Sequence, residues 1–135
     1  MTKLRKGEQE AERNRISQGV EDKSLLPKPT HQILVTTLKK RLAEVAGEQL
    51  QAVMIYGSMA WGHPDPDSDL DVAAIVQDCT PQLEGALLEA AYQVMWNHDF
   101  TPLISLKVFD AGSFAAYREK GFSFYRKVAE EGIAL

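Results

Sequence analysis

Apolar residues recur along the chain at two different spacings, and each spacing predicts a type of secondary structure. From Thr30, which can cap a helix, the apolar positions fall three or four residues apart: Leu34, Leu38, Leu42 and Val45. This is the spacing of one helix face, and a glycine often follows a helix end. We therefore expect a helix that starts at Thr30 and stops at Gly47.

Three short and nearly continuous apolar runs predict buried strands. They occupy residues 52–56, 69–77 and 102–109. Their length and their content of β-branched residues favour strands over helices. The first run stops at Gly57, which marks a turn.

Three further helices are expected in the second half of the chain. Thr80-Pro81 has the form of an N-cap followed by a proline in the first helical position. A helical stripe follows it: Leu83, Leu87, Ala91, Val94 and Met95. Residues 111–120 and 123–131 are predicted to form two short helices, and Gly132 is placed to end the second.

The order of these elements predicts an α+β fold with a small mixed β-sheet covered by helices. The turn at Gly57 and the acidic start of the second strand should meet at one edge of that sheet. With 135 residues, the chain can bury one core. We expect a single domain over residues 30–135, preceded by a charged arm over residues 1–29.

Charge and composition exclude several classes of protein. The net charge is -4, and residues 1–28 carry seven Lys/Arg against five Asp/Glu, so the body is acidic. An acidic body argues against strong non-specific binding to nucleic acid. Apolar runs of five or six residues are too short to span a membrane. Cys79 is the single cysteine, which excludes an internal disulfide and, with no apolar leader, favours a cytoplasmic location.

Asp69 and Asp71 form an acidic pair at the start of the second predicted strand. Side chains two residues apart in a strand share a face, so both carboxylates should project together while Leu70 and Val72 enter the core. Carboxylates this close repel each other unless a cation or a proton lies between them. A pair of Mg²⁺ ions would relieve the repulsion. The alternative is a solvated pair on an exposed strand.

The turn after the first predicted strand has the features of a phosphate site. Gly57 has no Cβ to block an approaching phosphate. Ser58 offers a hydroxyl at the start of a helical turn, where free N–H groups favour anions. Gly62 closes the turn. A Gly-Ser pair can also serve as a plain tight connection, but here it precedes an acidic pair, and the combination predicts a triphosphate beside a metal.

The sequence Gly57-Ser58, ten intervening residues and Asp69-x-Asp71 resembles the signature of the DNA polymerase β-like nucleotidyltransferase superfamily. The resemblance covers residues 30–135. Because no second domain follows, the chain looks like the minimal nucleotidyltransferase branch. The resemblance implies a polymerase β palm-like nucleotidyltransferase fold.

The resemblance also implies an activity and a set of site residues. The reaction would be Mg²⁺-dependent transfer of an NMP, with AMP from ATP as the expected case, to an acceptor hydroxyl with release of pyrophosphate. Asp69 and Asp71 would be the catalytic residues that bind two Mg²⁺ ions. The nucleotide would be bound by small residues of the turn and loop: Gly57, Ser58, Gly62 and Ser68.

The sequence departs from the family pattern at two positions. Active members commonly carry a third carboxylate on a neighbouring strand, but the third predicted strand has none, and Asp99 just before it is our candidate third catalytic acid. Trp61 stands where many relatives have a basic residue. Lys107, on the third strand, is expected to supply the missing cation to the nucleotide.

Two functions of different classes remain open. The first is an active nucleotidyltransferase. The second is a nucleotide-binding regulatory module with little or no catalysis, which would act as the antitoxin-like partner of a separate helical protein of the HEPN type. A homodimer is a further possibility. The intact acidic pair favours the enzyme, because a scaffold has no physical need for two adjacent acids behind a phosphate turn.

Overall fold

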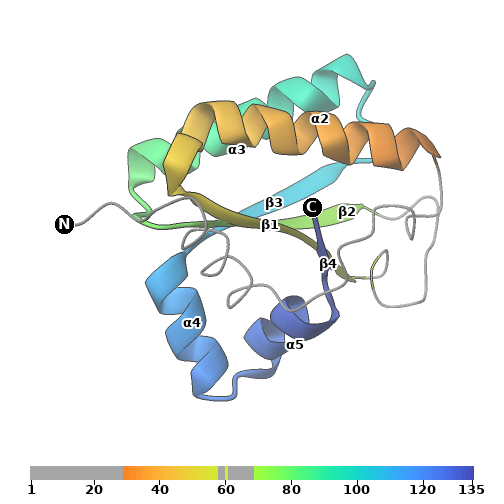
Figure 1. Cartoon of the computed structure of the whole chain (residues 1–135). Helices are drawn as coiled ribbons and strands as arrows, with labels where there is room; N and C mark the ends of the chain where they lie inside the picture. Colours follow the sequence, from red (N-terminus) through yellow and green to blue (C-terminus); the bar gives the residue numbers. More distant parts are fainter. Residues whose placement is uncertain (1–28, 58–59, 61–68) are drawn as a thin grey trace.

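The computed structural model describes residues 29–57, 60 and 69–135, which form a four-stranded mixed sheet with helices on both faces (Figure 1). The expected α+β class is confirmed. In chain order the elements are α2 (Pro29–Ala46), the 3₁₀ turn η2 (Gly47–Gln49), β1 (Leu50–Tyr56), β2 (Leu70–Val76), α3 (Pro81–Asn97), β3 (Ile104–Asp110), α4 (Ala111–Glu119), α5 (Ser123–Glu131) and β4 (Ile133–Ala134).

Helix α2 forms where the leucine spacing predicts it. Three leucines are buried against the sheet: Leu34, Leu38 and Leu42. The helix begins at Pro29 rather than Thr30 and ends at Ala46, before Gly47 with its φ of +58°. Val45 was expected on the buried face but is exposed. Ala46 takes the buried position, because it continues the four-residue progression of the last two leucines.

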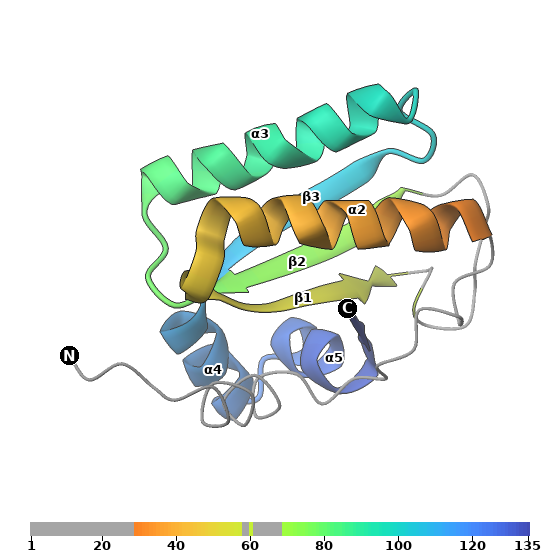
Figure 2. The same ribbon diagram turned by 45° about the horizontal axis from the view of Figure 1, so that its top comes forward.

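Helix α3 covers the same face of the sheet as α2, and the two helices run side by side in opposite directions (Figure 2). Its predicted cap is confirmed: the Oγ1 of Thr80 accepts a hydrogen bond from the N–H of Leu83 at 3.1 Å. The buried face of the helix carries Leu87, Ala90, Ala91 and Val94. Burial of this apolar face, rather than helix propensity, holds the helix on the sheet.

The strands follow the order β3-β2-β1-β4. Strands β1 and β2 are antiparallel, and β2 and β3 are parallel because α3 crosses over between them. In β2, alternate residues from Leu70 to Val76 face α2 and α3, whereas Ala73 and Ile75 face α4 and α5. Asp71 is the one residue of β2 that is not fully buried.

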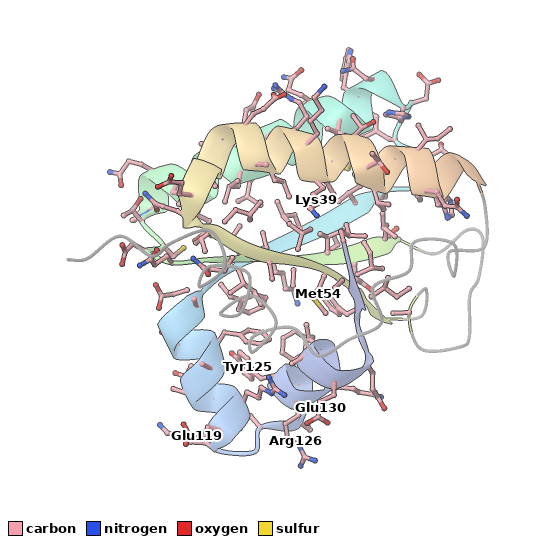
Figure 3. All side chains as sticks on the ribbon, in the orientation of Figure 1. Lys39, Met54, Glu119, Tyr125, Arg126 and Glu130 are labelled. Atoms are coloured by element: carbon pink, nitrogen blue, oxygen red, sulfur yellow. The ribbon has the colours of Figure 1, made fainter. Side chains whose placement is uncertain are left out.

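The second face of the sheet packs against α4 and α5 through a smaller, aromatic core. Phe114 of α4 is buried there, and its ring lies edge-on to Tyr125 of α5 with centroids 5.3 Å apart. Met54 enters this core from the sheet, opposite Tyr125 (Figure 3). The two helices agree with the predicted ranges to within one residue. Gly121 separates them with a φ of +85°.

Strand β4 was not predicted. It pairs with the end of β1 through Ile133, and its two residues are too few to give a periodic pattern. Lys39 of α2 donates a hydrogen bond to the carbonyl of Leu135. These long-range contacts, rather than the local sequence, hold the strand in place.

Gly132 ends α5 as predicted, but for a different reason from the expected one. Its φ is -68°, so no left-handed conformation is involved. A Cβ at this position would collide with the carbonyl oxygen of Val128 and would lie 3.1 Å from that of Ile55. Glycine is required because α5 turns into β4 directly against backbone atoms of β1.

Replacing Gly132 by alanine should therefore destabilise the fold. We expect Gly132→Ala to lower the free energy of unfolding by about 1–3 kcal/mol, since backbone atoms cannot move aside as a side chain can. The matched control is Gly85→Ala, at an exposed position of α3 where no atom outside the local helix backbone lies within 4 Å of the new methyl group. That change should raise stability by about 0.5–1 kcal/mol. Denaturant unfolding measures both, and equal effects would contradict the steric account.

Asp110 links three elements at the end of β3. Its Oδ1 accepts a hydrogen bond from the N–H of Cys79 at 3.2 Å, and its Oδ2 accepts one from the N–H of Ser113 as the N-cap of α4. The hydrogen bond from Cys79, followed by that from Ser113, lowers the pKa of the Asp110 carboxyl. The ionised form therefore stabilises the folded state.

Asp110→Ala should lower the free energy of unfolding by about 1 kcal/mol at neutral pH, as loss of an N-cap does. Because the pKa is lower in the folded state, the contribution is present above the unfolded value of about 3.9 and is lost as pH falls through the folded pKa. The difference between wild type and variant should shrink in strong acid. A difference that stays constant down to pH 2 would contradict this role.

Candidate functional site

The candidate site begins where β1 ends. Gly57 follows Tyr56 with a φ of +76°, a conformation that L side chains rarely adopt. The N–H of Ala60 then donates to the carbonyl of Gly57 at 3.0 Å, which closes a single turn. Four of the residues singled out from the sequence fall outside the described residues: Ser58, Trp61, Gly62 and Ser68.

The carboxylate of Asp71 lies directly against the backbone of Gly57. Strand pairing sets Asp71 opposite Tyr56, the residue before the turn. A Cβ added at Gly57 would collide with Oδ2 of Asp71 and would lie 3.2 Å from its Cγ. Glycine at residue 57 is thus required twice, by its φ and by the carboxylate above it. The turn and the acidic strand meet at the ends of the two central strands, not at an outer edge of the sheet.

Asp71 lies on the face of the sheet opposite α2 and α3, and Asp69 immediately precedes the strand. Leu70 and Val72 are completely buried, as predicted, whereas Asp71 is half-buried and Asp69 is exposed. Burial, and then the nearby charge of Asp69, raises the pKa of the Asp71 carboxyl. The electrostatic coupling means that the two acids lie near each other.

Strand β3 brings a cation and a hydroxyl to the same face. Ser105 pairs with Asp71 across the parallel ladder, and Lys107 pairs with Ala73. The positive charge of Lys107 favours the ionised form of Asp71. It partly offsets the effects of burial and of Asp69, although the pKa of Asp71 stays raised overall. The Nζ of Lys107 also lies 5.7 Å from the ring centroid of Phe124, within cation–π range.

Two aromatic residues, Tyr56 and Phe124, lie near Asp71 and Lys107 respectively. Tyr56 is buried, and burial, followed by the charge of Asp71, raises the pKa of its phenol. Its ring lies edge-on to that of Phe124 with centroids 5.6 Å apart. The proximity of Tyr56 to Asp71 was not predicted, because the long connection between β1 and β2 leaves the register of the two strands open.

Asp99 lies in the turn after α3, exposed and with a φ of +56°. Within residues 29–57 and 69–135, no three His, Cys, Asp or Glu side chains come together closely enough to hold a metal ion. In this conformation, Asp99 does not join Asp69 and Asp71. The residues that β3 presents beside Asp71 are Ser105 and Lys107 instead.

A small cavity of about 130 Å³ lies at the other side of the sheet, where α2 passes the start of β1. Its walls include Lys39, Ala43 and Gln51, and none of the candidate site residues. It is smaller than the roughly 300 Å³ that ligand pockets usually need. The chemistry that the sequence suggests is therefore concentrated at Gly57, Asp71 and Lys107.

No family model matches this chain, and no curated protein matches its sequence. None of the helices in the described ranges has the length and apolar composition needed to cross a membrane. The functional argument accordingly depends on the chemistry of the residues themselves.

Asp71 should cost stability when nothing is bound to it. Its folded-state pKa is raised above the ordinary 3.8, so its contribution is favourable in acid and is lost as pH rises through the folded pKa. We expect Asp71→Asn to raise the melting temperature of the metal-free protein at neutral pH by a few degrees. The gain should disappear below about pH 4.

Asp78→Asn is the matched control, because Asp78 is an exposed acid just beyond the other end of β2. Its melting temperature should stay close to that of wild type across the same pH range. Calorimetry or circular dichroism at several pH values measures these shifts. A wild type that is more stable than Asp71→Asn at neutral pH without metal would contradict the electrostatic account.

Proposed function

We propose that this protein is a Mg²⁺-dependent nucleotidyltransferase, which transfers an NMP from an NTP, with ATP as the expected donor, to an acceptor hydroxyl. The observation that carries the proposal is the contact between the Asp71 carboxylate and the backbone of Gly57. It fixes a carboxylate that could hold Mg²⁺ beside the turn at which the nucleotide phosphates are expected to bind. The resemblance of these residues to the polymerase β-like signature supports the same function.

The donor groups at the site suit magnesium. Asp69 and Asp71 offer carboxylate oxygens, and Mg²⁺ commonly takes one or two carboxylates together with substrate phosphates. Burial, and then the charge of Asp69, raises the pKa of Asp71, and a bound cation would relieve both effects. Bound Mg²⁺ would supply neutralisation of phosphate charge and activation of the attacking oxygen.

The remaining residues bind and orient. The missing Cβ of Gly57 leaves room for the Asp71 carboxylate beside the turn, and Lys107 adds a positive charge for the nucleotide on the same face as Asp71. The rings of Tyr56 and Phe124 contact each other on the same face of the sheet as Asp71. Catalysis of this kind depends chiefly on positioning and charge stabilisation rather than on covalent chemistry.

A second candidate function has its own support. The strand beside Asp71 presents Ser105 and Lys107 where active relatives commonly carry a third carboxylate. A site with two acids and a lysine can bind a nucleotide and still transfer it slowly. Such a chain would act as a regulatory module, for example as the partner of a separate helical protein.

Transfer of label from α-labelled ATP in the presence of Mg²⁺, with pyrophosphate release, tests the catalytic proposal. We expect Asp69→Asn and Asp71→Asn each to reduce the rate by at least about 100-fold, since each removes charge stabilisation at the reacting phosphate. Asp78→Asn should keep the wild-type rate. Equal rates in wild type and both site variants would rule out catalysis through these residues.

Nucleotide binding separates the two candidate functions. We expect Lys107→Ala to weaken ATP binding by about tenfold, through loss of one charge-assisted contact. Calorimetric titration with a non-hydrolysable ATP analogue and Mg²⁺ measures this change. Binding without any label transfer to protein or small-molecule hydroxyls would favour the regulatory module. No change in affinity in Lys107→Ala would contradict the role given to this residue.

A further inference from the structure

The outer side of α3 carries a stripe of large apolar side chains that nothing in the described structure covers. Leu88, Tyr92 and Trp96 lie four residues apart and are all exposed, with Trp96 62% exposed. The stripe continues into Phe100, whose ring centroid lies 5.5 Å from that of Tyr92 and 5.9 Å from that of Trp96. Contiguous exposed aromatic side chains of this kind mark interaction surfaces.

The stripe lies on the side of α3 that borders β3. Phe100 belongs to the turn that leads from α3 into β3, and the N–H of Ile104 at the start of β3 donates to Sδ of Met95. Leu103, immediately before β3, is also exposed. Helix α3 packs on β3, whereas α2 packs on β1 (Figure 2). The stripe and the strand therefore belong to the same flank of the molecule.

Strand β3 forms one edge of the sheet, and within the part of the chain that the structure describes no strand pairs with its outer side. The carbonyl of Leu103 bonds to β2, so the odd-numbered residues of β3 direct their backbone groups inward. Residues 106 and 108 consequently direct theirs outward. A seven-residue edge with free backbone groups can pair with a further strand.

We propose that a second copy of this chain docks here, by antiparallel pairing of β3 with β3 and packing of α3 on α3. A bare peptide strand could pair with the edge but would leave the aromatic stripe in water. A second copy supplies both elements in the same relative positions. Two-fold symmetry makes such an interface self-complementary.

A single two-fold axis allows both the pairing of β3 with β3 and the packing of α3 on α3. An axis at Lys107 would oppose two like charges, whereas an axis at Leu106 sets Lys107 of one copy opposite Ser105 of the other. Leu106 lies about 6.6 Å beyond Ile104, at roughly 3.3 Å per strand residue. In the antiparallel helix this corresponds to about four residues before Met95, at about 1.5 Å each, which is the level of Ala91. Tyr92, the middle residue of the exposed stripe, lies one residue away, so the axis is placed at Tyr92.

The stripe is symmetric about that level. Leu88 and Trp96 each lie four residues from Tyr92, so the axis brings Leu88 of one copy onto Trp96 of the other and Tyr92 onto Tyr92. The acids of α3 do not oppose each other, because Glu89 falls level with Met95 of the second copy and Glu84 level with Phe100. Helix α3 has 17 residues and is therefore about 25 Å long, so the flank has the length that a small specific interface needs.

Sedimentation equilibrium from micromolar to near-millimolar protein tests the dimer. We expect wild type to dimerise with a dissociation constant in the micromolar range. Trp96→Ala and Tyr92→Ala should raise that constant by about 10- to 100-fold, as loss of central aromatic anchors does. The control is Phe122→Ala, which removes an equally exposed aromatic ring from the far side of the molecule and should leave the constant unchanged.

Cross-linking tests the axis itself. In a Cys79→Ser background, Tyr92→Cys should form a covalent dimer rapidly on mild oxidation, whereas Phe122→Cys should not. A wild type that stays monomeric throughout overturns the proposal, and so do equal effects of Trp96→Ala and Phe122→Ala. Neither measurement uses nucleotide or metal, so the result is independent of the proposed catalytic function.

Discussion

The close approach of the Asp71 carboxylate to the Cα of Gly57 is the contact on which the site depends. It ties the end of β1 to the start of β2, because Tyr56 must lie opposite Asp71 for the carboxylate to reach residue 57. It also restricts residue 57 to glycine, through both a positive φ and the space above its Cα. The position of the acid relative to the turn is therefore set by strand pairing, whatever path the intervening loop takes.

Two acids of this chain have pKa values shifted in opposite directions. The backbone N–H groups of Cys79 and Ser113 lower the pKa of Asp110, so its charge stabilises the fold. Burial and the charge of Asp69 raise the pKa of Asp71, so its charge opposes folding. Acids whose pKa is raised by burial and a like-charged neighbour occur often at functional sites, where a bound cation can neutralise them. The contrast favours a functional role for Asp71 over a structural one.

Local patterns predicted most of the fold, and long-range contacts account for the rest. The helices and the three longer strands follow from apolar spacing and from signals such as Thr80-Pro81, which act within a few residues. Strand β4 and the steric need for Gly132 arise from contacts with β1 that no local pattern contains. At the site, the alternation of polar and apolar residues predicted that Asp71 points away from the core that contains Leu70 and Val72. The proximity of Tyr56 to Asp71 depends on the register between β1 and β2, which no local pattern predicts.

Strand β3 connects the two proposals physically. Its inner side pairs with β2 and carries Ser105 and Lys107 to Asp71, while its outer side is the edge at which a second copy would pair. In the register centred on Leu106, Lys107 of the second copy lies opposite Ser105, so dimerisation would add a cation beside the acidic site. If this added charge strengthens nucleotide binding to the dimer, the nucleotide must in turn strengthen dimerisation. Both effects have the same factor, because coupling between two binding equilibria is reciprocal.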